Sequence, residues 1–154
     1  MNKSEEPAGE GGEAEVTPIT QVNFVEDYYT LFSKISWAGI SLSEKESYLL
    51  TNSIRNLSAK LQAGQCTFFG KIYGTEKDYY IVQASDLEAP EGGGENETDH
   101  MEKRKEDGVN QFVYFVTNDL TSEWKELPDV KPSQIIGSRL IRYTFIGNLN
   151  KKIY

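Results

Sequence analysis

Residues 68–82, FFGKIYGTEKDYYIV, decide the fold of this chain. Two arms rich in aromatic and β-branched residues flank the polar residues 74–77, whose glycine suits a tight reversal. The pattern predicts a β-hairpin. A third run, FVYFV at residues 112–116, is apolar at every position, so both of its faces should be covered. We therefore place this run centrally in a sheet that includes the hairpin.

The sequence before the hairpin predicts two amphipathic helices. Apolar residues recur at helical spacing from Val25 to Ile35, Asn23 can serve as the N-cap, and Gly39 suits the left-handed position that ends a helix. A second helix begins at the capping box of residues 43–46 and ends near Gly64. We expect its apolar stripe to be buried in this domain rather than to dock a partner helix. The stripe comprises Leu50, Ile54, Leu57 and Leu61.

The predicted fold class is α+β, with an N-terminal antiparallel helix pair packed on a mainly antiparallel, aromatic-rich β-sheet. Residues 1–19 are predicted to be a disordered acidic tail, and residues 20–154 one domain. Within that domain, residues 85–107 are predicted to be a disordered acidic insertion, because a loop of this length and polarity rarely forms regular structure.

The C-terminal part of the chain predicts three short elements. Residues 124–127 should form an extended piece stopped by Pro128. Pro132 should begin a short helix that runs through Ile136. Residues 139–146 alternate apolar side chains, which predicts a last strand, although another turn of helix remains an alternative. The alternating residues are Ile141, Tyr143 and Phe145.

Charge and composition exclude several classes of function. The net charge of −8 is carried by residues 1–19 and 85–107, which sum to −10 and leave the remainder at +2. A main partner such as nucleic acid would need a concentrated basic face, so none is expected. No apolar run has membrane-spanning length, and residues 1–6 lack the apolar core of a signal peptide. Together with a single cysteine, these features predict an intracellular protein without a membrane partner.

No catalytic, cofactor-binding or metal-binding arrangement is visible in the sequence. Gly70 and Lys71 lack the spacing of a phosphate-binding loop. Cys66 has no neighbouring histidine or second cysteine, so we expect a thiol in the core. His100 has no nearby nitrogen or sulfur ligand. Asp78 and the neighbouring Glu76 should be solvated at the hairpin tip, and we predict that the chain is not an enzyme.

Aromatic residues are the remaining candidates for function. The chain has nine tyrosines, seven phenylalanines and two tryptophans. Such side chains serve either packing or assembly, because they are large, rigid and, for tyrosine and tryptophan, able to hydrogen-bond at one end. For any single one we favour packing. The candidate interface residues are Trp37, Phe69, Tyr73, Tyr79, Tyr80, Tyr114 and Trp124.

Three blocks of the sequence resemble the radial spoke head protein family, in the branch of spoke proteins 4 and 6. They are WAGISLS at 37–43, FGKIYGTEKDYYIV at 69–82, and NQFVYFVTN at 110–118 with its continuation to Gly147. Phe69 stands where the family usually has tryptophan. Members of this branch extend well past Tyr154, so the chain resembles a shortened version, either a fragment or a short relative.

This resemblance implies a non-enzymatic structural subunit of the radial spoke head in the axoneme of motile cilia and flagella. There it would assemble with a paralogue or itself and with other head subunits, and the head would meet the central pair apparatus. No cofactor is implied. Two hypotheses of other classes remain open. One is a soluble acidic adaptor that reaches basic partners through its charged segments. The other is an enzyme, which would need Lys71, Asp78 and Cys66 to converge in a cleft.

Overall fold

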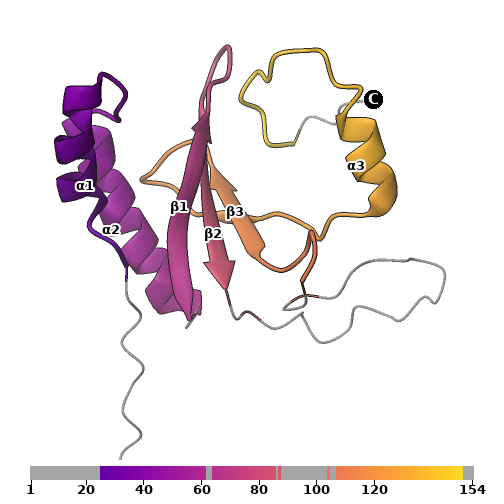
Figure 1. Cartoon of the computed structure of the whole chain (residues 1–154), viewed down its shortest axis with the longest axis horizontal. Coiled ribbons are helices and arrows are strands. Elements are labelled where there is room, and N and C mark those ends of the chain that lie inside the picture. Colours follow the sequence, from indigo (N-terminus) through magenta and orange to yellow (C-terminus); the bar gives the residue numbers. More distant parts are fainter. Residues whose placement is uncertain (1–24, 62–63, 86, 88–103, 105–106, 151–154) are drawn as a thin grey trace, which may run out of the picture.

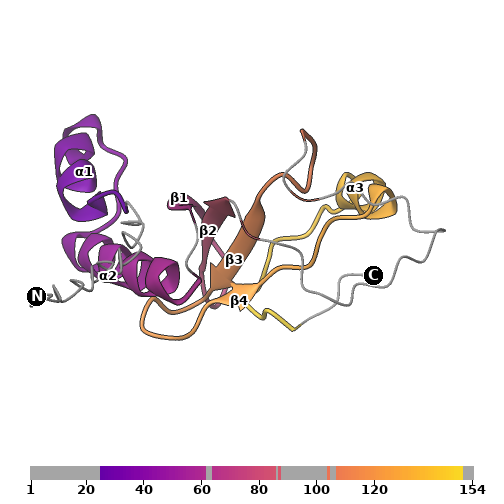
Figure 2. The ribbon, with the colours of Figure 1, turned by 90° about the horizontal axis from the view of Figure 1, so that it is seen from below.

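The computed structural model describes residues 25–61, 64–85, 87, 104 and 107–150. Helices α1 (Tyr28–Ile35) and α2 (Glu44–Leu61) lie on one side of a four-stranded sheet, as Figure 1 shows. The C-terminal segment with α3 (Pro132–Ser138) lies on the other side, and the view from below separates the same three parts (Figure 2). The predicted α+β class is therefore confirmed.

The sheet is antiparallel throughout and has the order β1-β2-β3-β4. The predicted hairpin is formed by β1 (Gln65–Ile72) and β2 (Tyr79–Ser85), while the third run supplies β3 (Val113–Thr117). The extended piece before Pro128 is β4 (Lys125–Glu126). The interior position of β3 was predicted correctly. One face of β3 is buried, and on the other Val116 is buried while Tyr114 is half-buried.

A β-bulge in β1 determines which side chains reach the helices. Phe68 pairs with Val82 and Gly70 pairs with Ile81, so Phe69 is the extra residue. Side chains alternate along a strand, and one extra residue shifts the alternation by one. Phe69 lies on the outer face of the sheet, away from the helices, and the shift turns Lys71 to the helix side.

Both helices are capped by side chains. Glu46 accepts a hydrogen bond from the Ser43 amide (3.1 Å) and donates its own amide to Ser43 Oγ (3.3 Å), which is the predicted capping box. The cap of α1 was predicted wrongly. Asp27 is its N-cap and accepts from the Thr30 amide (3.4 Å) and hydroxyl (2.7 Å), whereas Asn23 lies outside the described residues. The short side chain of Asp27 immediately precedes the first turn, which is the position that capping requires.

The core lies between the helices and the sheet. The apolar stripe of α2 packs there as predicted: Leu50 and Ile54 are fully covered, Leu57 is buried and Leu61 is half-buried. Cys66 is a buried core thiol, as predicted. On the sheet side, every second residue of β2 contributes a side chain to this core. These residues are Tyr80, Val82 and Ala84.

A 3₁₀ turn, Ser36–Ala38, joins the two helices, and Gly39 ends it with a φ of 82°. This is the left-handed position predicted for Gly39. Gly74 in the hairpin has a different reason for being glycine. A Cβ there would collide with the carbonyl oxygen of Lys77, so the turn requires space rather than a left-handed backbone.

The predicted last strand at 139–146 is wrong, and so is the alternative of a continued helix. The helix α3 begins at Pro132 as predicted and ends at Ser138, and residues 139–146 form neither helix nor strand. Only their C-terminal end bonds to the turn of the hairpin: the amides of Thr75 and Glu76 donate to the carbonyls of Phe145 (2.9 Å) and Ile146 (3.1 Å). A strand needs a partner along its length, and these residues have none.

The predicted boundaries of the acidic insertion, residues 85 and 107, are too wide. Ser85 is the last residue of β2 and pairs with Gln65. Arg104 is held by charged hydrogen bonds to Glu126 (2.9 Å) and Asp129 (2.9 Å), with little of its side chain exposed. Most of the insertion, including His100, and the tail of residues 1–19 lie outside the described residues.

Candidate interaction surface

The seven candidate aromatic residues divide sharply by exposure. Tyr80 is buried, and Tyr79, Tyr114 and Trp124 are half-buried. The three exposed ones are Trp37 (95%), Tyr73 (72%) and Phe69 (61%). Sequence reasoning treated all seven alike, because burial depends on what the tertiary fold places over each ring.

The buried and half-buried rings are used for packing. Tyr80 donates its hydroxyl to Glu46 (2.7 Å). Trp124 donates its indole N–H to Ser53 Oγ (2.8 Å) and lines a groove beside α2. Tyr79 meets Phe145 edge-on, with ring centroids 6.0 Å apart. These contacts hold the helices and the C-terminal segment to the sheet.

The exposed residue Trp37 sits on a rigid corner between the helices. The left-handed Gly39 ends the turn, and the Ser41 hydroxyl donates to the Phe32 carbonyl (2.9 Å) and ties the outgoing chain to α1. Ile40 beside it is also largely exposed. A tryptophan on a fixed backbone whose ring is left in water is typical of an interface residue.

The other two exposed rings belong to β1 and the turn that follows it. Phe69 lies on the outer face of the sheet, edge-on to Tyr114 at a centroid distance of 5.3 Å. Tyr73 follows β1 directly, where Lys71 Nζ lies 5.0 Å from its ring centroid. Figure 1 shows the helical corner and the hairpin tip at the same end of the molecule. We call Trp37, Phe69 and Tyr73 the exposed aromatic set.

A cluster of charged side chains, which sequence reasoning missed, joins α2 to the hairpin. Lys71 Nζ binds Glu46 (2.7 Å) and Asp78 (3.0 Å), and its side chain is only 11% exposed. Asp78 also accepts a hydrogen bond from the Gly74 amide (3.2 Å). The prediction that its carboxylate is freely solvated is therefore wrong. The available signal was Lys71 within the otherwise uncharged, aromatic-rich run FFGKIY at residues 68–73.

The cluster is electrostatically satisfied rather than reactive. Burial alone would raise the pKa of Glu46, yet hydrogen bonds from Lys71, Ser43 and Tyr80 lower it to about 2. Burial opposes the charge of Lys71 too, but Glu46 and Asp78 raise its pKa overall. Burial and the neighbouring Glu46 carboxylate raise the pKa of Tyr80. Each group is therefore held in its ordinary charge state at neutral pH.

The convergence that an enzyme would require is incomplete. Lys71 and Asp78 meet, but Cys66 lies in the core near the other end of β1, opposite Ala84, where burial raises the pKa of its thiol. Within residues 25–61, 64–85, 87, 104 and 107–150, no group of three potential metal ligands occurs. In the same residues no helix is long and apolar enough to cross a bilayer.

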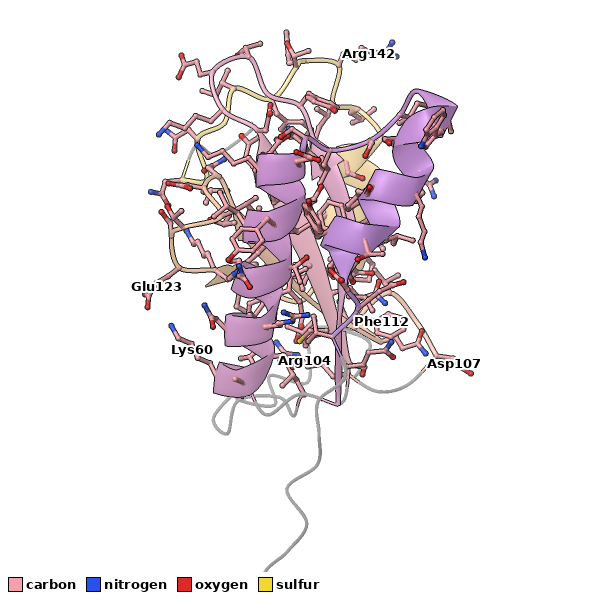
Figure 3. All side chains as sticks on the ribbon, turned by 90° about the vertical axis from the view of Figure 1, so that its left-hand side faces the viewer. Lys60, Arg104, Asp107, Phe112, Glu123 and Arg142 are labelled. Atoms are coloured by element: carbon pink, nitrogen blue, oxygen red, sulfur yellow. The ribbon has the colours of Figure 1, made fainter. Side chains whose placement is uncertain are left out.

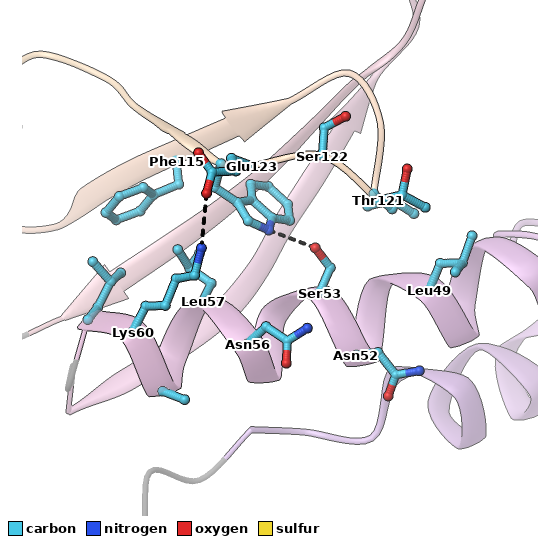
Figure 4. A pocket seen from close by; sticks show the side chains of 14 residues that line it. Leu49, Asn52, Ser53, Asn56, Leu57, Lys60, Phe115, Thr121, Ser122 and Glu123 are labelled. Atoms are coloured by element: carbon cyan, nitrogen blue, oxygen red, sulfur yellow. Dashed lines mark hydrogen bonds and ion pairs between the residues drawn. The ribbon is translucent and has the colours of Figure 1, made fainter.

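An open groove of about 710 Å³ lies between α2 and the turn after β3. Its floor is apolar, and its rim carries the ion pair of Lys60 with Glu123 (3.2 Å), both visible in Figure 4. Charged or nucleophilic groups do not converge inside it. The lining includes Leu49, Leu57, Phe115, Leu120 and Trp124.

Comparison with known proteins identifies the family. The sequence model described as "Radial spokehead-like protein" matches residues 1–107 and 95–154. This chain belongs to that radial spokehead-like family. Radial spoke head protein 4 homolog A of Homo sapiens is 30% identical over 75% of this chain and 20% of its own length. Radial spoke head protein 6 homolog A of Homo sapiens is 25% identical over 75% of this chain and 22% of its own length.

A third similar protein is flagellar radial spoke protein 4 of Chlamydomonas reinhardtii, 27% identical over 61% of this chain. These names confirm the predicted branch of spoke proteins 4 and 6 and agree with the predicted axonemal location in cilia and flagella. This radial spokehead-like chain spans about a fifth to a third of the length of the relatives that it matches.

The three sequence blocks that carry the resemblance occupy distinct parts of the radial spokehead-like fold. Residues 37–43 form the corner that exposes Trp37 and begins α2. Residues 69–82 form most of the hairpin, including the lysine cluster. Residues 110–118 form β3, and their continuation runs through α3 to Gly147. All three exposed aromatic residues belong to these blocks: Trp37 and Phe69 begin the first two, and Tyr73 lies inside the second.

Proposed function

We propose that this chain is a non-enzymatic structural subunit of the radial spoke head in the axoneme of motile cilia and flagella. There it assembles with a paralogue or a second copy and with other head subunits. The head in turn supports contact with the central pair apparatus during the regulation of motility. Membership of the radial spokehead-like family is the main support for this proposal.

The structural observation that carries the proposal is the exposed aromatic set on a scaffold held rigid by packing. Trp37, Phe69 and Tyr73 are each more than half exposed, although aromatic side chains of this size gain about 2 kcal/mol or more from burial. The surrounding contacts fix the corner and the hairpin, so little conformational entropy is lost when a partner covers these rings. The charged cluster in the hairpin strengthens the same scaffold.

The test is affinity purification of the tagged full chain from isolated axonemes of a motile ciliated cell. We expect other spoke head subunits to co-purify with the wild-type chain. The triple variant Trp37→Ala, Phe69→Ala, Tyr73→Ala should lose most of them, because its apolar contact area is removed. The matched control Trp37→Phe, Phe69→Tyr, Tyr73→Phe keeps three aromatic rings and should retain them.

Two results would contradict the proposal. Recovery of no spoke head subunit by the wild-type chain would contradict membership of the assembly. Equal recovery by both triple variants, with unchanged circular dichroism, would show that the exposed aromatic set is not the contact. Deletion of residues 1–19 and 88–103, which leaves Ser85 and Arg104 in place, should preserve binding. Loss of binding in that deletion would favour the acidic adaptor instead.

A further inference from the structure

The segment from Arg139 to Phe145 is the largest discrepancy between sequence pattern and structure. Its sequence, RLIRYTF, alternates apolar side chains in the manner of a strand, but it belongs to no strand. All seven residues are exposed, and Leu140 and Tyr143 are 72% and 83% exposed. We call residues 139–145 the unpaired segment. Places where local sequence preference and structure disagree are often functional sites.

Both ends of the unpaired segment are fixed. At its start, the amides of Leu140 and Ile141 donate to carbonyls in the last turn of α3 (3.0 and 3.2 Å). At its end, Thr75 in the hairpin donates to the Phe145 carbonyl (2.9 Å), and the Gly147 amide donates to the Tyr79 hydroxyl (2.7 Å). Between these anchors, the backbone of residues 142–144 forms no hydrogen bond with any described residue.

Both edges of the sheet are protected against the addition of another strand, whereas the unpaired segment is not. The edge strand β1 contains a bulge and an inward-pointing lysine, Lys71, and its Phe68 amide is occupied by the Tyr28 hydroxyl (2.7 Å). Bulges and inward charges are common means of preventing strand addition. The other edge, β4, has only two residues, and its Glu126 is held by Arg104. The unpaired segment has neither a bulge nor an inward charge.

The charge around the unpaired segment indicates the chemistry of a partner. Residues 130–150 contain three basic residues and no acidic one. Arg139 and Arg142 are exposed and form no ion pair with any described residue. Figure 3 shows Arg142 at the end of the molecule opposite Lys60 and Arg104, with its side chain pointing outward. An acidic ligand along this segment could bind two guanidinium groups that pair with no described residue.

We propose that the unpaired segment binds an acidic, extended polypeptide segment of a neighbouring chain by strand addition. Backbone hydrogen bonds to residues 142–144 complete the pairing that the alternating sequence favours, and Arg139 and Arg142 bind carboxylates of the added strand. This inference rests on the proposed function only in taking the neighbour to be another spoke head subunit. A polypeptide is favoured over nucleic acid because two free arginines on a nearly neutral domain attract a polyanion weakly.

The test uses the full chain and a synthetic nine-residue peptide in which glutamate alternates with threonine or valine, carrying a fluorescent label. Fluorescence anisotropy at low salt should show binding that weakens as salt is raised. The double variant Arg139→Glu, Arg142→Glu should bind about tenfold or more weakly, because two attractive contacts become repulsive. The control Lys34→Glu, Lys45→Glu makes the same charge change on exposed helix residues and should bind within about twofold of wild type.

Hydrogen exchange measured by NMR tests the backbone pairing separately. The amides of residues 142–144 should exchange rapidly in the free chain and slowly with the peptide bound, whereas those of β2 should not change. Binding without protection at 142–144 would overturn strand addition. Equal binding of a peptide with lysine in place of glutamate, or stronger binding of an oligothymidine, would overturn the choice of an acidic polypeptide. None of these results depends on the exposed aromatic set, so failure here is distinguishable from failure of the proposed function.

Discussion

Replacement of Lys71 by methionine tests the charged cluster between α2 and the hairpin. Among the described residues, Lys71 is the only cation in contact with Glu46 and Asp78, and methionine keeps an unbranched side chain of similar length. Glu46 and Asp78 are about 30% exposed and would be left close together without a counterion. Breaking a largely buried pair by removing one partner is strongly destabilising.

The magnitude follows from the pKa of Glu46, which the fold lowers from 4.5 to about 2. At 1.36 kcal/mol for each tenfold change in proton affinity, this lowering corresponds to about 3 kcal/mol. Ser43 and Tyr80 also contribute to this lowering, and solvent screens a side chain that is 30% exposed, so the part lost with Lys71 is about 2 kcal/mol. We therefore expect Lys71→Met to lower the free energy of unfolding by about 2 kcal/mol at pH 7.

The stability difference between wild type and Lys71→Met should depend on pH. The folded-state pKa of Glu46 is depressed, so its stabilisation is present above about pH 4.5 and lost as the pH falls towards 2. The difference in stability between wild type and Lys71→Met should therefore shrink across that window. Urea denaturation followed by circular dichroism at pH 7 and at pH 2.5 measures both quantities.

A matched control is available on the surface. Lys60 pairs with Glu123 at 3.2 Å, but both side chains are more than two-thirds exposed, so Lys60→Met should cost less than about 0.5 kcal/mol. Adding Glu46→Gln to Lys71→Met should restore part of the lost stability, because one uncompensated charge is removed. Equal destabilisation by the two lysine variants, or a Lys71→Met cost that is the same at both pH values, would refute the reasoning.

Four further substitutions test the fold. Ile54→Ala should cost about 2–5 kcal/mol in urea denaturation, because the side chain is fully buried; a cost below about 1 kcal/mol would contradict its place in the core. Gly147→Ala should release the unpaired segment from the hairpin, since φ is +101° and a Cβ would lie 2.5 Å from the Lys77 carbonyl oxygen. Faster amide exchange at Thr75 would report the release, and unchanged exchange would argue against it. Tyr28→Phe should cost about 0.5–1.5 kcal/mol through loss of the hydrogen bond to the Phe68 amide, again by urea denaturation. Trp37→Ala should change the thermal stability by less than about 0.5 kcal/mol, and a larger loss would show that the indole packs within the domain.

Features that depend on local chemistry could be predicted from the sequence. The capping box at Ser43 and Glu46 is a contact between residues three apart, and Gly39 needs only its own backbone freedom. The hairpin follows from two β-prone arms around a polar turn. The predicted cap, Asn23, precedes the observed cap, Asp27, by about one turn, because periodicity locates a helix end only to within a turn.

Much of the candidate surface could not be predicted, because exposure is a property of the whole fold. Tyr79 and Tyr80 are adjacent, yet Tyr80 faces the helices and is buried while Tyr79 meets Phe145 on the outer face. The lysine cluster depends on the bulge after Phe68, which no local pattern announced and which turns Lys71 towards Glu46. Contacts between residues 25 positions apart are invisible to periodicity.

The sequence by itself determined the helices with most of their ends, the hairpin, the interior strand and membership of the radial spokehead-like family. These depend on side-chain periodicity, capping and motif spacing, all of which are encoded within short stretches of chain. Only the tertiary structure decided that Trp37, Phe69 and Tyr73 face water and that residues 139–145 have no strand beside them. A strand exists only where a second backbone supplies hydrogen bonds, and whether one is present depends on how distant parts of the chain are placed.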